Sequence, residues 1–134
     1  MKSILNKLPN WTLSIITVLA ILWLTLAPKP LGDEPPKLFP GADKVVHAIM
    51  FGGFTIVMLL DWQRKNQWKM VKTQRAFLSA TVSAILGILI EIAQAQMGLG
   101  RGFEYADIIA DTIGAYIFAI LWLFLQDFWI ADNP

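Results

Sequence analysis

The chain has 134 residues, of which 56% are hydrophobic and only 16% are charged, whereas soluble domains carry about 25% charged residues. This composition excludes an ordinary soluble domain and favours a single all-α integral membrane domain over residues 1–134. The formal net charge of +1 gives no sign of nucleic-acid binding, and the absence of cysteine excludes disulfides, thiolate metal sites and cysteine nucleophiles.

The first apolar run covers residues 11–27 and follows a short segment that contains Lys2 and Lys7. At about 1.5 Å per residue, this run is just long enough to cross a bilayer. We predict a retained transmembrane helix. A cleaved signal sequence is the alternative, and Pro28 opposes it because it directly follows the nearest candidate cleavage site. A proline-rich connector over residues 28–41 follows, where fixed φ angles and missing amide donors oppose helix formation.

Three further apolar segments predict transmembrane helices over residues 43–62, 76–96 and 105–129. A basic loop over residues 62–75 joins the first two of these segments, and a glycine-rich turn over residues 97–103 joins the last two. Small residues recur four positions apart, for example at Ser83 and Gly87 or at Ala110 and Gly114. Such pairs let helix backbones approach closely, so we predict a small bundle of four transmembrane helices.

The distribution of basic residues predicts the topology. Seven of the eleven lysines and arginines lie either before the first helix or in the loop between the second and third helices. The positive-inside rule therefore places both termini in the cytoplasm, as expected for a multi-pass protein of the bacterial cytoplasmic membrane. Four tryptophans then lie at the same interface, as in an aromatic belt: Trp11, Trp62, Trp68 and Trp129.

This topology brings the polar residues of three helices to the outer face. They are Asp43, Lys44 and His47 at the start of the second helix, Glu91 and Gln94 near the end of the third, and Glu104, Asp107 and Asp111 around the start of the fourth. Polar residues three or four positions apart share one helix face. Ionisable side chains at membrane depth are costly when they face lipid. We therefore expect these residues to face one another and to form a small polar pocket that opens outward.

Three segments of the chain resemble the VanZ-like family: residues 43–47 (DKVVH) with Phe51, residues 90–94 (IEIAQ) and residues 101–114 (RGFEYADIIADTIG). The resemblance covers the last three predicted helices, and it implies a role in the cell envelope. The family takes its name from a protein associated with resistance to the glycopeptide antibiotic teicoplanin. Asp111 departs from the family pattern, which often has Asn at this position.

We consider two functions for the predicted pocket. In the first, Arg101 and Lys44 bind an anionic lipid or a lipid-linked cell-wall precursor, and the protein thereby influences glycopeptide susceptibility. Arg101 suits this role because the planar guanidinium group of arginine matches phosphate and carboxylate groups. In the second, the protein is an enzyme in which Glu91 and His47 act as an acid–base pair on a lipid-linked substrate. Both functions have a structural alternative: His47 could simply hydrogen-bond to Glu91 or Asp111, and Gln94 could act only as a brace.

We predict no cofactor and no metal ligand. The chain lacks an HExxH motif or comparable spacing, although His47, Glu91, Asp107 and Asp111 together could bind a divalent ion as an alternative. The predicted partners are the lipid bilayer and the anionic envelope component, with no nucleic acid.

Overall fold

The computed structural model describes every residue except 1, 34–37, 99, 101 and 132–134. Its described part is all α-helical, in keeping with the predicted fold class. The elements are α1 (Lys2–Leu5), α2 (Thr12–Leu26), α3 (Ala42–Lys65), α4 (Thr73–Gln96) and α5 (Tyr105–Ala131). By length and composition, α3, α4 and α5 could cross a membrane, while α2 is an apolar helix of 15 residues. The chain is a multi-pass membrane protein.

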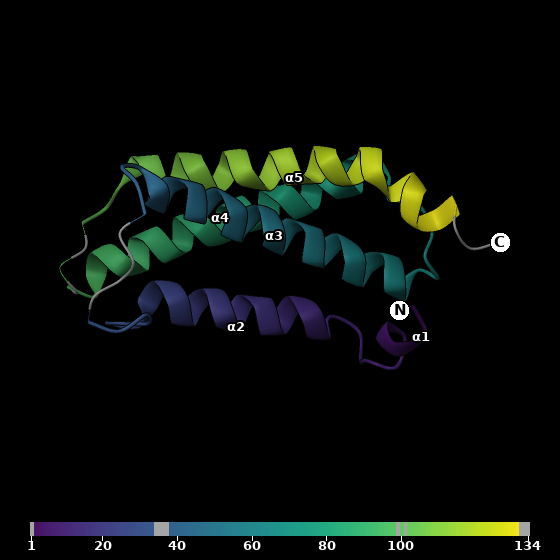
Figure 1. Cartoon of the computed structure of the whole chain (residues 1–134), viewed down its shortest axis with the longest axis horizontal. Helices are drawn as coiled ribbons and strands as arrows, with labels where there is room; N and C mark the ends of the chain where they lie inside the picture. The colour runs from purple at the N-terminus through teal and green to yellow at the C-terminus, as the bar shows by residue number, and fades with distance from the viewer. Residues whose placement is uncertain (1, 34–37, 99, 101, 132–134) are drawn as a thin grey trace.

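The four longer helices lie side by side in a bundle (Figure 1). Helix α5 packs against α3 and α4, and α2 contacts α3 and α4 on the side away from α5. We call the end of the bundle formed by the start of α3, the end of α4 and the start of α5 the polar end. The opposite end, formed by α1, the end of α3 and the start of α4, is called the basic end.

Two groups of buried apolar side chains hold the bundle together. One group joins α3, α4 and α5 near the basic end, and the other joins α2, α3 and α4. Their members are Leu59, Val71, Ala76, Ala80, Ala115, Ala119 and Trp122 in the first group, and Ile21, Phe51, Phe54, Met58 and Ile90 in the second. Large apolar side chains on the outer faces, such as Phe124 and Phe128, are more than two thirds exposed. These faces suit contact with lipid chains.

Small residues bring the helix backbones together, as predicted. A Cβ atom added at Gly114 would lie 2.1 Å from the carbonyl oxygen of Ala48, and one added at Gly52 would lie 2.5 Å from the ring of Phe118. On α4, a Cβ atom at Gly87 would lie 2.6 Å from a carboxyl oxygen of Asp111. The predicted role of Gly87 and Gly114 in close packing is therefore confirmed, while the equivalent role of Gly52 was missed.

Several predicted helix boundaries were wrong. Helix α3 continues to Lys65 rather than ending at Trp62, and α4 begins at Thr73 rather than at Ala76. The charged residues 61–65 look like a helix end in the sequence, but Asp61 and Gln63 are buried on α3, where other segments supply their hydrogen-bond partners. The predicted loop over residues 62–75 is correspondingly shorter. The short helix α1 was not predicted.

Candidate functional site

The side chain of Lys44 occupies the centre of a charged cluster at the polar end. Lys44 lies in the first turn of α3, and its ammonium group lies 2.8 Å from the carboxyl group of Asp43. It also pairs with Glu104, just before α5, and with Asp107, in the first turn of α5. The Lys44 side chain is 30% exposed, so the cluster lies at the rim of the bundle rather than in its core.

One turn further into the bundle, His47 joins α3 to α5. Its Nδ1 atom lies 2.9 Å from Oδ1 of Asp111, and its Nε2 atom lies 3.8 Å from Oδ2 of Asp107. The imidazole ring also stacks on Phe51, with 6.3 Å between the ring centroids. Asp111 is buried beside the backbone of Gly87. A histidine held by a buried carboxyl group at one nitrogen has its other nitrogen directed for hydrogen bonding or proton transfer.

Glu91 is buried near the end of α4 and ties that helix to the segment before α5. Glu91 is only 2% exposed, and its Oε1 atom accepts a hydrogen bond of 2.6 Å from the backbone N–H of Glu104. A buried carboxyl group that accepts a backbone N–H orders the connecting loop. Glu91 therefore positions Glu104 beside Lys44.

Gln94 performs the bracing role that its sequence position suggested. Its Nε2 atom donates a hydrogen bond of 2.8 Å to the carbonyl oxygen of Thr25. This bond joins the last turn of α2 to α4 at the polar end. Loss of this hydrogen bond would leave the buried amide group of Gln94 without a partner, which costs free energy. Gln94 therefore fixes the position of α2 relative to the charged cluster.

The chain as a whole is similar to a known protein family. The model of the VanZ/LLP1 family matches residues 3–126, which is nearly the whole chain. The chain belongs to the VanZ/LLP1 family. No curated protein matches it, and no solved structure matches it either.

In this VanZ/LLP1 protein, the structure brings together most of the residues that the sequence singled out. Asp43, Lys44, His47, Glu104, Asp107 and Asp111 form one network between α3 and α5, and Glu91 joins it through the backbone of Glu104. Gln94 lies one turn further along α4 and contacts α2 instead. Arg101, the proposed anion-binding residue, lies outside the described residues. Its described neighbours Gly98 and Gly100 have positive φ angles of 64° and 74°, which glycine adopts without strain.

The cluster carries more acidic than basic side chains. Asp43, Glu91, Glu104, Asp107 and Asp111 provide five carboxyl groups, while Lys44 and His47 are the basic groups among the described residues. Oxygen atoms of Asp43, Glu104 and Asp107 lie within 4.8 Å of one another, a spacing that a divalent ion could use. The ammonium group of Lys44 already pairs with all three of these carboxyl groups. This set differs from the His47-containing set considered from the sequence.

Sequence reasoning missed a second polar network, at the basic end. Asp61 is almost completely buried, and its Oδ2 atom accepts hydrogen bonds of 2.8 Å from both the backbone N–H and the hydroxyl of Ser14. The other carboxyl oxygen of Asp61 pairs with Arg64. The spacing of Asp61 and Arg64, three residues apart on a helix, was the available signal. Ser14 gave none, because its partner lies 47 residues away.

Proposed function

We propose that this protein binds a lipid-linked or anionic component of the cell envelope at the polar end and thereby influences susceptibility to glycopeptide antibiotics. The observation that supports this proposal is the partly exposed ammonium group of Lys44, held at the rim of the bundle by carboxyl groups from α3 and from the start of α5. Exposed ion pairs contribute little to stability, so a ligand can exchange with them at low cost. Arg101, which lies between α4 and α5 in the sequence and outside the described residues, would add a second cationic group.

The charges of the cluster restrict the chemical class of the proposed ligand. The carboxyl groups of four residues lie beside Lys44 or His47, so a bare anion would meet repulsion from several directions; these residues are Asp43, Glu104, Asp107 and Asp111. A head group that carries hydrogen-bond donors or an amine beside its phosphate or carboxylate would instead satisfy both kinds of side chain. We therefore favour a head group with both types of charge or with several hydroxyl or amide donors.

Exposed apolar residues beside the cluster suit the lipid part of such a ligand. Phe103 and Tyr105 form an edge-to-face pair with centroids 4.9 Å apart, and Tyr105 is 75% exposed. Ile109, one turn further along α5, is also exposed. Aromatic side chains are favoured at membrane interfaces because one part contacts hydrocarbon while the other stays near water. The acyl or isoprenoid chain would lie along this face of α5.

The proposal includes the membrane topology. We propose that α2 is a fourth span, that the protein lies in the bacterial cytoplasmic membrane, and that both termini are cytoplasmic. The support is the concentration of lysine and arginine at the basic end, which the positive-inside rule assigns to the cytoplasm. The polar end would then contact the outer leaflet, where lipid-linked cell-wall precursors and glycopeptides meet.

The binding proposal can be tested by replacing Lys44 with Gln in the full-length protein. Co-purified lipid would be measured by native mass spectrometry, and teicoplanin susceptibility would be measured in cells that produce each variant. Lys29→Gln is the matched control, because Lys29 lies at the same end and pairs with Asp33 outside the cluster. We expect Lys44→Gln to reduce lipid retention roughly tenfold, as for one lost charge-assisted hydrogen bond, and Lys29→Gln to leave it unchanged. Equal retention in both variants would contradict the proposal.

A second candidate function is an enzyme at the same site, and the geometry of His47 favours it. Asp111 holds the Nδ1 atom of His47, which directs Nε2 toward the less buried side, near Asp107. This arrangement suits a general base that takes a proton from water as the water oxygen attacks the terminal phosphorus of a lipid-linked diphosphate. The bridging P–O bond would break, which releases inorganic phosphate and leaves the lipid monophosphate. Glu91, the partner expected from the sequence, would then order the loop rather than transfer a proton. Phosphate release from such a lipid should be lost in His47→Gln and retained in Lys29→Gln; full activity in His47→Gln would exclude this function.

A further inference from the structure

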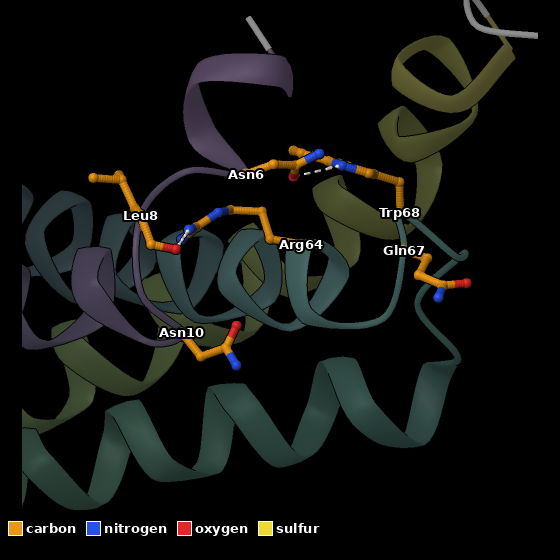
Figure 2. A pocket seen from close by; sticks show the side chains of 6 residues that line it. All are labelled: Asn6, Leu8, Asn10, Arg64, Gln67 and Trp68. Atoms are coloured by element: carbon orange, nitrogen blue, oxygen red, sulfur yellow. Dashed lines mark hydrogen bonds between the residues drawn. The ribbon is translucent and has the colours of Figure 1, made fainter.

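A separate cavity lies at the basic end, far along the bundle from the charged cluster. Its volume is about 270 Å³, and its lining comes from the segment between α1 and α2 and from the end of α3 with the following loop. Figure 2 shows the lining residues, which are Asn6, Leu8, Asn10, Arg64, Gln67 and Trp68. Because α3 ends at Lys65, the cavity is at the level where a span meets the lipid head groups.

The walls of this cavity are held in place by specific contacts. The guanidinium group of Arg64 donates to the backbone carbonyl oxygens of Leu5 and Leu8, at 3.1 and 2.9 Å, and pairs with the buried carboxyl group of Asp61. The indole N–H of Trp68 donates to the side-chain oxygen of Asn6 at 3.0 Å (Figure 2). The cavity is therefore a built feature that joins two segments far apart in sequence.

The backbone at this end is also strained. The described non-glycine residues with positive φ angles are Trp11 (66°), Gln67 (56°) and Trp68 (59°), and all of them line the cavity or follow one of its lining residues. A non-glycine residue in this region is energetically unfavourable. Such strain persists only where surrounding contacts hold it, and it is concentrated at binding sites. Here the strained backbone places the side chains of Gln67 and Trp68 at the cavity.

The charge around the cavity is strongly positive. Seven basic residues belong to this end of the bundle: Lys2, Lys7, Arg64, Lys65, Lys69, Lys72 and Arg75. The described acidic residues near it are Asp61, which is buried against Arg64, and Asp127 near the end of α5. The ammonium group of Lys2 lies 5.3 Å from the ring centroid of Trp68. An anion in the cavity would thus experience a favourable field from several directions.

We propose that this cavity binds the phosphate head group of an anionic phospholipid from the leaflet that the basic end faces. Asn10 and Gln67 are two of the lining residues (Figure 2), and their amide groups would donate hydrogen bonds to the head group. Lys2 and its basic neighbours would supply the field, and Leu8 and Trp68 would contact the glycerol and the first methylene groups. This site is independent of the function proposed for the polar end.

The test uses two nearly isosteric substitutions that add negative charge to the cavity, Asn10→Asp and Gln67→Glu, combined in the full-length protein. Binding of dioleoylphosphatidylglycerol and of dioleoylphosphatidylcholine to the delipidated protein in detergent would be compared by native mass spectrometry. We expect the unmodified protein to retain the anionic lipid preferentially and the double variant to bind it roughly tenfold more weakly, as for lost hydrogen bonds to a charged group. Unchanged binding in the double variant would overturn the proposal.

Two controls make the result specific. Gln74→Glu adds one negative charge at an exposed position in the first turn of α4, outside the cavity lining, and should leave binding unchanged; an equal loss there would show general attraction to basic residues and overturn the site. Lys29→Gln removes a cation at the polar end, outside the charged cluster, and should also leave this binding unchanged; an equal loss there would show that the lipid does not select the basic end and would overturn the site. Inorganic phosphate should displace bound dioleoylphosphatidylglycerol much less effectively than added free lipid does. Equally effective displacement by inorganic phosphate would identify a free anion as the ligand and overturn the lipid assignment.

Discussion

The Nδ1 atom of His47 on α3 lies 2.9 Å from the Oδ1 atom of Asp111 on α5. This contact joins two helices at the point where Asp111 also packs against the backbone of Gly87 on α4. One buried carboxyl group therefore contacts both other long helices. Any change at Asp111 should affect bundle stability and the orientation of the imidazole together.

Substitutions of Asp111 should separate the hydrogen bond from the charge. Asp111→Asn keeps the shape beside Gly87 and an oxygen that can accept from His47, so it should cost less than about 1 kcal/mol. Asp111→Ala leaves the half-buried imidazole without its partner and should cost about 1–3 kcal/mol. Thermal unfolding in detergent would measure the stability of both variants. If Asp111→Ala were as stable as the unmodified protein, the contact between His47 and Asp111 would not stabilise the bundle.

Close packing of α3 and α5 predicts different effects for two glycines. Gly114→Ala places a methyl group 2.1 Å from the carbonyl oxygen of Ala48, so the helices must separate, at a cost of about 1–3 kcal/mol or more. Gly53→Ala, on the open side of α3, meets nothing within 4 Å and should be neutral or stabilising by up to about 1 kcal/mol. Denaturation in detergent would rank the two variants. Similar effects for both would show that α3 and α5 do not meet at Gly114.

Gln126 should control the loop between α3 and α4. Its Oε1 atom accepts from the backbone N–H of Val71 at 2.7 Å, and its Nε2 atom donates to the carbonyl oxygen of the same residue at 3.1 Å. Gln126→Leu would leave both buried backbone groups without these partners, at a cost of about 1–3 kcal/mol. Hydrogen exchange at the amide of Val71 should become faster. The neighbouring exposed substitution Asp127→Asn is the control, and equal exchange rates in the two variants would contradict this role.

The proposed topology predicts which ends are accessible to a membrane-impermeant thiol reagent. The chain contains no cysteine, so single cysteines can be introduced at Gly102, at the polar end, and at Lys69, at the basic end. Both positions are exposed. In intact cells, cysteine at position 102 should be labelled and cysteine at position 69 should be labelled only after permeabilisation. The reverse pattern would invert the orientation and place the charged cluster at the inner leaflet.

The sequence alone determined the membrane class, the approximate positions of the apolar helices and the family. It also determined that Lys44, His47, Glu91 and Asp107 lie at one end, because hydropathy and the order of helices along the chain are local properties. The family match over residues 3–126 and the apolar helices confirm the family and the membrane class. The functional roles of these residues stay predictions.

Only the tertiary structure decided which side chains pair. His47 contacts Asp111 and lies near Asp107, whereas Glu91 accepts from the backbone of Glu104, a distinction that depends on the rotation and register of helices packed at Gly87 and Gly114. The burial of Asp61 against Ser14 likewise depends on how α2 packs on α3, and the cavity at the basic end depends on how the segment before α2 folds back on α3. Contacts between residues tens of positions apart have no local pattern in the sequence, because packing of the whole bundle sets them.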